Sequence, residues 1–175
     1  MKGTGSTKII YSDFVSQLSS IQVKDKQVEK SSEVTLTDSE NIVKLIFSRE
    51  LTTCESLFEN CIKIIEVDLT DFISSNVKNM LRMFYNCESL ISVKFGYFQT
   101  SKVEDMGYIF YGCKLITSIN LSFMVTSKAD LMDYMFYNCE NLIYLDLSSF
   151  ITTQVTNMEY MFYGCKKLEY LNLLK

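Results

Sequence analysis

Six cysteines, at positions 54, 61, 87, 113, 139 and 165, are the residues of this sequence with the widest range of possible chemistry. Four of them follow an aromatic pair, as in MFYNC at residues 83–87 and again at 135–139. Thiolates bind metals, attack electrophiles and form disulfides. Each of these roles requires a spacing or a partner residue that the sequence either contains or lacks.

Metal binding and nucleophilic catalysis both lack the residues that they need. A zinc site holds its ligands within about 2.3 Å of one ion, yet the sequence contains no Cys-x-x-Cys pair and no His. A cysteine nucleophile needs a base or an electropositive setting, and no such residue recurs beside the cysteines. We therefore expect no metal, no cofactor and no catalytic residue, and predict that the protein is not an enzyme.

The cysteine spacing shows an internal repeat. From Cys61 onward, the cysteines follow one another at equal steps of 26 residues. Repeats 1 to 4 begin at Cys61, Cys87, Cys113 and Cys139, and a partial fifth repeat closes the chain. Residues 51–60 match the last ten positions of a repeat. A period of about 20–29 residues is typical of leucine-rich-repeat solenoids.

Each repeat contains two apolar patterns. Residues six and eight after the cysteine, such as Leu145 and Leu147, have the two-residue spacing of a strand that buries alternate side chains. The second half has offsets of 0, 3 and 7, as in Val155, Met158 and Phe162, which predict one face of a short helix. A Ser/Thr pair between the two halves predicts a turn and a helix cap.

We therefore predict an α/β fold, a leucine-rich-repeat solenoid with a parallel strand ladder on one face and short helices on the other. Residues 1–50 lack the pattern and contain TKIIY, SIQVKD and NIVKLIF, which predict a strand-rich N-terminal cap segment. Residues 51–175 would form the solenoid. Because the chain ends on LNLLK without a polar capping repeat, we predict an array truncated at its C-terminus.

Disulfides are the remaining thiol chemistry. A bridge needs Cβ atoms about 3.8 Å apart, whereas equivalent cysteines on adjacent repeats have nearly parallel Cβ vectors and, on a helical face, a separation of about 8–10 Å. Regular bridges along the column are therefore not expected. The off-period pair of Cys54 and Cys61 stays open. For the others we predict a structural role, as small buried apolar groups that seal each repeat.

The repeat pattern C-x-x-L-x-x-L-x-L-S-x-F-x-T-S-x-V-x-x-M-x-x-M-F-Y-x resembles the 26-residue repeat of BspA-type leucine-rich-repeat surface proteins. Repeat 4 is a near-ideal copy, and the resemblance runs from about Leu51 to the end of the chain. Repeat 3 departs from the pattern at Met124, in place of the loop Phe, and at Ala129, in place of the helix Val. The resemblance implies a cell-surface or secreted recognition module, in some cases adhesive, without shared catalytic residues.

We expect partner binding on the exposed strand face, as in other repeat proteins. The outward positions lie five and seven residues after each cysteine and vary between repeats, while the inward positions do not. The candidate partner-binding residues are Glu66, Asp68, Ser92, Lys94, Ser118, Asn120, Tyr144, Asp146, Tyr170 and Asn172. Mere tolerance of a solvated face would produce the same variation.

A second set of residues could form an exposed aromatic column for a ligand. These are the tyrosines that follow the repeated Phe, namely Tyr85, Tyr111, Tyr137 and Tyr163. We favour a structural interpretation, in which they are half-buried helix ends whose hydroxyls reach water.

The partner that the resemblance implies is a protein or a glycan, and composition and charge suggest no other class. The net charge of −4 and the scattered basic residues give no reason to expect nucleic acid. No segment approaches the roughly 18 apolar residues of a membrane span, and the start lacks a signal-peptide core. The sequence NLS at positions 120–122 permits N-glycosylation of a secreted eukaryotic protein.

Two functions stay open. The first is a recognition or adhesion module at the cell surface or outside the cell, as the resemblance implies. The second is an intracellular, cytoplasmic scaffold for protein–protein interaction, which reduced thiols and a missing signal peptide would suit.

Overall fold

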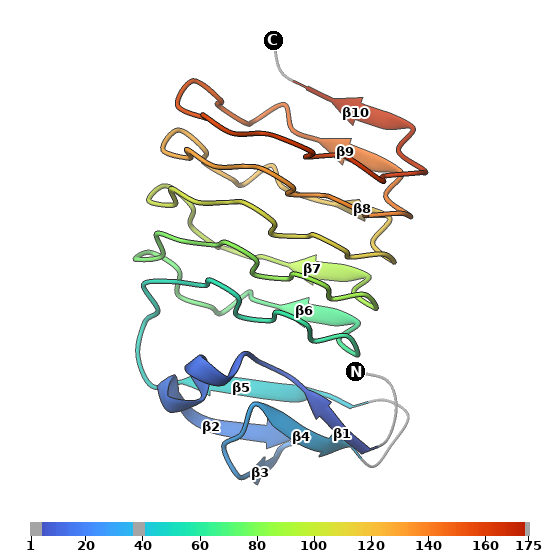
Figure 1. Cartoon of the computed structure of the whole chain (residues 1–175). Helices are drawn as coiled ribbons and strands as arrows, with labels where there is room; N and C mark the ends of the chain where they lie inside the picture. Colours follow the sequence, from blue (N-terminus) through green and yellow to red (C-terminus); the bar gives the residue numbers. More distant parts are fainter. Residues whose placement is uncertain (1–4, 37–40, 174–175) are drawn as a thin grey trace.

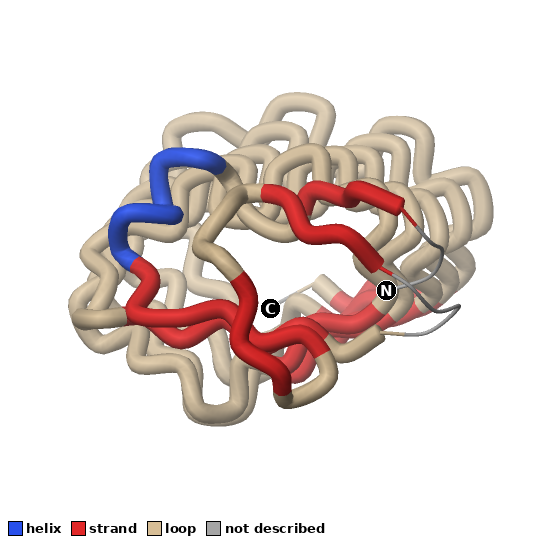
Figure 2. Tube along the Cα trace, turned by 90° about the horizontal axis from the view of Figure 1, so that it is seen from below, coloured by secondary structure: helices blue, strands red, loops and turns tan. Residues whose placement is uncertain are grey.

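The computed structural model of the chain describes residues 5–36 and 41–173. In chain order the elements are β1 (Gly5–Lys8), the 3-10 helix η1 (Ser12–Gln17), β2 (Leu18–Val23), β3 (Lys26–Val28), β4 (Glu33–Leu36), β5 (Val43–Phe47), β6 (Glu66–Asp68), β7 (Ser92–Lys94), β8 (Ser118–Ile119), β9 (Tyr144–Asp146) and β10 (Tyr170–Asn172). Strands β1 to β5 lie at one end, and the 26-residue repeats are stacked above them (Figure 1). Seen along the stack, successive repeats superimpose (Figure 2).

Two small antiparallel sheets form the N-terminal end. Strand β1 pairs with β4, and β2 lies between β3 and β5. The turn between β2 and β3 places Lys24 and Asp25 at φ values of 49° and 62°, and a tight two-residue hairpin of type I′ requires positive φ at both positions. The Tyr11 amide donates a hydrogen bond of 2.9 Å to the Leu57 carbonyl, which joins this end of the molecule to the repeats.

The strand side of the repeats is divided into two parallel sheets. One contains β6 and β7, and the other contains β8, β9 and β10. Within the described chain, no strand pairing joins β7 to β8. At this break Phe95 and Phe123 pack at 4.7 Å between ring centroids. The expected continuous strand ladder is therefore interrupted between repeats 2 and 3.

The opposite side of the repeats consists of turns that are joined from repeat to repeat. Parallel bridges link Thr53, Asn79, Asp105, Leu131 and Asn157 in sequence order. Alternate backbone amides donate to carbonyls of the next repeat, at 2.9 Å from Met80 to Asp105, 3.0 Å from Arg82 to Gly107 and 2.9 Å from Phe84 to Ile109. Backbone groups that a helix would satisfy within itself are here satisfied between repeats.

The prediction of an α/β leucine-rich-repeat solenoid with short helices is wrong. The described chain consists of small sheets joined by turns, and its one helix is η1, outside the repeats. The physical reason lies in residues with left-handed backbone. Arg82, Tyr108, Tyr134 and Tyr160 have φ values of 57°, 57°, 55° and 54°, and such a residue ends a right-handed helix after less than one turn.

The apolar spacing that suggested a helix has another origin. Tight turns follow one another, closed by hydrogen bonds between residues three apart, such as Met83 to Met80 at 3.1 Å and Cys87 to Phe84 at 3.1 Å. A series of such turns also directs side chains three and four residues apart inward. Val77, Met80 and Phe84 are accordingly buried without a helix.

The Ser/Thr residues expected to cap helices bind the next repeat instead. The Thr100 hydroxyl accepts a hydrogen bond from the Val125 amide at 2.7 Å and donates to the Val125 carbonyl at 3.2 Å. Thr126 makes the same pair of bonds with Ile151, at 2.7 and 3.0 Å. Both threonines are buried, so each holds the loop of the repeat above in register.

Aromatic rings form the centre of the core. Phe58, Phe84, Phe110, Phe136 and Phe162 stack in order, with centroid distances of 5.3, 5.5, 5.7 and 5.9 Å. The middle three are fully buried. Offset stacking of this kind adds stability beyond the burial of apolar area, so the phenylalanine column ties each repeat to its neighbours.

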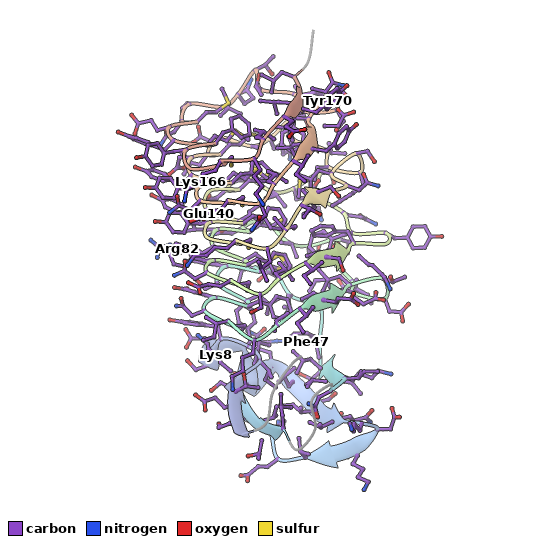
Figure 3. The ribbon with its side chains drawn as sticks, turned by 90° about the vertical axis from the view of Figure 1, so that its right-hand side faces the viewer. Lys8, Phe47, Arg82, Glu140, Lys166 and Tyr170 are labelled. Atoms are coloured by element: carbon purple, nitrogen blue, oxygen red, sulfur yellow. The ribbon has the colours of Figure 1, made fainter. Side chains whose placement is uncertain are left out.

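From Cys87 onward, the residue that directly follows the repeat cysteine is charged, and these side chains form ion pairs between neighbouring repeats on the outside of the stack. Lys114 lies 2.8 Å from Glu88, and Lys166 lies 3.1 Å from Glu140, the pair labelled in Figure 3. A hydrogen bond and the charge of Glu88 raise the pKa of Lys114. Exposed pairs like these stabilise a fold only slightly.

The last complete repeat has an open upper face. Met158 is 48% exposed, whereas the equivalent Met80, Met106 and Met132 are 0% exposed. The division at residue 50 and the truncation of the array both stay predictions. Among the described residues, no helix is long and apolar enough to cross a membrane.

Candidate functional site

The structure places the ten candidate strand-face residues on the surface of the strand side. Glu66, Asp68, Lys94, Ser118, Asn120, Tyr144 and Tyr170 are exposed, and Ser92, Asp146 and Asn172 are half-buried. Figure 3 shows Tyr170 on this side, with Arg82 on the side away from it. Asn120, the residue of the NLS sequence, lies just beyond the end of β8. Its glycosylation stays a prediction.

The lower part of the strand face is charged. The Lys94 ammonium lies 3.7 Å from the Asp68 carboxylate, and both side chains are largely exposed. Hydrogen bonds from Thr70 and the nearby charge of Lys94 hold the pKa of Asp68 below its usual value. Both residues, together with Glu66, also line the wider hollow between β5 and the first repeat.

The upper part is aromatic and polar. The rings of Tyr144 and Tyr170 are stacked, with 4.7 Å between centroids and 4° between planes. The parallel register places Ser118 opposite Tyr144 on the other neighbouring strand. Because serine is small, no ring of a described residue lies against the face of Tyr144 that points toward β8.

A hollow of about 330 Å³ lies at this place. Its lining comes from β8, β9 and the loops that follow them: Ser118, Ile119, Asn120, Leu121, Ser122, Tyr144, Asp146, Ser148 and Ser149. All four predicted outward positions of repeats 3 and 4 are brought together here, namely Ser118, Asn120, Tyr144 and Asp146. The loop serines Ser122, Ser148 and Ser149 were not predicted, although each lies two or three residues after an outward Asn or Asp, which could have indicated them.

The electrostatics of the hollow leave one charge. Hydrogen bonds from the Ser148 hydroxyl and amide lower the pKa of Asp146, and Asn172 lowers it further. Burial, with the nearby Asp146 and Tyr170, raises the pKa of Tyr144. At neutral pH the carboxylate is therefore ionised and the phenol is neutral.

A wider hollow of about 1,770 Å³ lies between β5 and the first repeat. Inside it Phe47 and Phe72 pack edge to face at 5.7 Å. This contact holds the N-terminal sheet against the repeats, so the apolar lining there already has a structural role.

The tyrosines on the turn side form two columns rather than one. The predicted column, Tyr85, Tyr111, Tyr137 and Tyr163, is stacked at 4.6, 4.7 and 5.0 Å. A second column, three residues earlier in each repeat, contains Arg82, Tyr108, Tyr134 and Tyr160. Sequence reasoning missed this second column, although the recurrence of Tyr at a fixed offset was visible.

Ring faces within these columns cover one another. Tyr111, for example, lies between Tyr85 and Tyr137, with interplanar angles of 14° and 3°. Arg82 closes the lower end over the rings of Tyr85 and Tyr108, at 5.7 and 5.5 Å. The columns therefore expose ring edges and hydroxyls. The tyrosines end turns, not helices as predicted, and their contacts fit a structural role.

The cysteines form a regular set of buried hydrogen bonds. Cys87 donates through Sγ to the Phe58 carbonyl at 3.1 Å, and Cys113, Cys139 and Cys165 make the equivalent bonds at 3.2, 3.1 and 3.1 Å. All six thiols are free, including Cys54 and Cys61. Among the described residues, no group of three or more His, Cys, Asp or Glu could hold a metal ion.

Burial keeps these thiols protonated. Desolvation raises the pKa of Cys54 and of Cys61 to about 12. It raises the pKa of Cys165 to about 11. A thiolate is the reactive form of cysteine, so the environment works against nucleophilic chemistry.

Comparison with known proteins corrects the resemblance. The family model that matches is described as "Mycoplasma protein of unknown function, DUF285", and it covers residues 52–172. The assignment to BspA-type leucine-rich-repeat surface proteins is therefore wrong. No curated protein and no solved structure gave a significant match. Since the matched residues make up more than half of the sequence, the chain belongs to the DUF285 family.

Proposed function

We propose that the protein is a non-catalytic recognition module that binds a protein or glycan partner through its strand face. The observation that carries the proposal is the hollow beneath Tyr144, where a ring, a carboxylate and an amide converge. Binding sites commonly combine an apolar wall with a few converging polar groups. Ile119 and Leu121, which belong to the core, form the floor of the hollow, and the other lining residues are outward or loop residues.

The proposed absence of enzymatic activity is supported by the chemistry of the candidate nucleophiles. The sequence has no His, the commonest general base. Burial raises the pKa of Cys87, Cys113 and Cys139 well above the usual thiol value. A screen that found turnover lost on Cys113→Ala replacement, with the fold intact, would overturn this part of the proposal.

The place of action is proposed to be the cell surface or the exterior, with an intracellular scaffold for protein–protein interaction as the alternative. Surface labelling of intact cells, with an antibody that cannot enter them, distinguishes the two. Signal on intact cells supports the surface module. Recovery in the cytosolic fraction alone supports the scaffold.

The test of the function is a binding screen of the full chain against purified secreted and surface proteins and against printed glycans. Wild type is compared with Tyr144→Ala and Asp146→Ala, and Tyr163→Ala, on the turn side, serves as the matched control. We expect a partner whose binding falls in the two strand-face variants and persists in the control. Equal binding by all four proteins would reject the assignment of the site.

A further inference from the structure

We infer that the hollow beneath Tyr144 binds one ring of a neutral glycan, which stacks on the uncovered face of the tyrosine. The inference rests on the proposed recognition function and narrows the partner to a carbohydrate. It depends on three features of the hollow, which are the ring face, the polar groups beside it and the charge of the lining.

The ring face is the first feature. Tyr170 covers one face of Tyr144 at 4.7 Å, and the residue paired on the other side is Ser118. On the turn side, by contrast, Tyr111 and Tyr137 each have a stacked ring on both faces. The axial C–H groups of a pyranose form an apolar patch that packs against the electron-rich face of an aromatic ring. Tyr144 therefore has a face that a sugar can use.

The polar groups match the hydroxyls of a sugar. Asp146 accepts at its Oδ1 from the Ser148 amide at 2.8 Å and from the Asn172 side chain at 3.2 Å, and the Ser148 hydroxyl also bonds to the carboxylate. An ionised carboxylate has about four acceptor positions, so Asp146 keeps capacity to accept from a sugar hydroxyl. Asn120 uses its Oδ1 to accept from the Ser122 amide and hydroxyl at 3.0 and 2.7 Å, which within the described residues leaves Nδ2 as a donor. A hydroxyl both donates and accepts hydrogen bonds, so neighbouring hydroxyls of one sugar can donate to the Asp146 carboxylate and accept from the Asn120 Nδ2.

The charge and size of the hollow select the kind of glycan. None of the described residues that line it is Lys or Arg, and Asp146 is ionised at neutral pH. A phosphate, a sulfate or an acidic sugar would be repelled by that carboxylate. The volume of about 330 Å³ is at the lower end of the roughly 300–1,000 Å³ of ligand sites. A single neutral sugar ring within a glycan is small enough for this volume and carries no charge that Asp146 would repel.

The experiment uses the full chain and a printed array of neutral, sialylated and sulfated oligosaccharides, with proline-rich peptides as a further arm. The best neutral hit is then titrated as the free sugar. Tyr144→Ala removes the ring. Ser118→Tyr places a ring against Tyr144 and fills the hollow while continuing the tyrosine stack. Glu66→Tyr, which adds a tyrosine elsewhere on the strand face, is the matched control, and thermal unfolding checks the fold of each variant.

We expect a neutral glycan to bind wild type and Glu66→Tyr equally, with affinity lowered at least about tenfold in Tyr144→Ala and Ser118→Tyr. The inference is overturned if only acidic glycans or peptides bind, or if Ser118→Tyr binds the neutral glycan as well as wild type. A purified protein or peptide that depends on Tyr144, without glycan binding, would overturn the sugar assignment and leave the recognition function standing. No Tyr144-dependent partner of any class would overturn both.

Discussion

Replacement of Cys113 by alanine should destabilise the stack of repeats. The thiol is 0% exposed, and its Sγ donates to the Phe84 carbonyl at 3.2 Å. Removal of a buried group of about methylene size costs about 0.8 kcal/mol, and a lost hydrogen bond costs about 0.5–1.5 kcal/mol. The Phe84 carbonyl still accepts a hydrogen bond of 3.1 Å from the Cys87 amide, so the substitution leaves no buried acceptor without a partner. The expected loss is therefore about 1–2.5 kcal/mol.

The assay is thermal unfolding followed by circular dichroism in reducing buffer. For a chain of this size, at about 2–4 °C per kcal/mol, the loss corresponds to a fall in Tm of roughly 2–10 °C. Cys113→Ser keeps a donor but buries a hydroxyl in an apolar site, so we expect it to be destabilised as well.

Cys165→Ala is the matched control. Its Sγ makes the same bond, to the Phe136 carbonyl at 3.1 Å, but the side chain is only half-buried. The loss there should be smaller than at Cys113. Unchanged stability of both Cys113 variants, or equal losses at the two positions, would refute the structural role of the buried thiols.

Four further predictions follow from particular contacts. Gly112→Ala should lower Tm, because the added Cβ lies 2.5 Å from the Asn86 Oδ1 and the backbone has a φ of +70°. Asn86→Gly in the same chain should restore part of the lost Tm. An unchanged Tm in Gly112→Ala would contradict this close approach of the two repeats. Asp105→Asn should raise Tm at pH 7, because burial raises the pKa of the Asp105 carboxyl and its ionised form therefore destabilises the folded state. The gain in Tm should shrink as the pH falls toward 3.8, where the carboxyl becomes protonated. A gain that is the same at every pH would exclude this cause. Maleimide should label Cys165 before the other thiols, and uniform rapid labelling without denaturant would contradict their burial. Phe110→Ala should lower the free energy of unfolding, measured in urea, by about 3–5 kcal/mol. A loss below about 1 kcal/mol would show that the phenylalanine column does not stabilise the stack.

The period of 26 residues could be read from the sequence because the cysteines mark it directly. With that period, the sequence alone places Ser118, Tyr144 and Tyr170 at equivalent positions of successive repeats. The stacked pair Tyr144–Tyr170 and the small residue beside it follow from that alignment. The break between β7 and β8 does not follow, because it coincides with the packing of two large side chains, Phe95 and Phe123, from neighbouring repeats.

The helices were predicted wrongly because three-residue spacing has two physical sources. A helix produces it, and so does a chain of tight turns whose amides bond the next repeat. The residues that decide between them are Arg82, Tyr108, Tyr134 and Tyr160, which hold a left-handed backbone. Glycine or asparagine would have signalled that conformation, whereas arginine and tyrosine rarely adopt it. The leucine-rich-repeat family was inferred separately, from the 26-residue repeat pattern, and it is wrong because the family model that matches is DUF285.

The central claim is that partners bind the strand face, and tyrosine resonances can report on it directly. The full chain is prepared with ¹³C-labelled tyrosine rings and titrated with the partner found in the binding screen. If partners bind the strand face, we expect the largest chemical-shift changes at Tyr144 and Tyr170, which stack beside the hollow. The largest changes at Tyr111, Tyr134 or Tyr137, on the turn side, would contradict it.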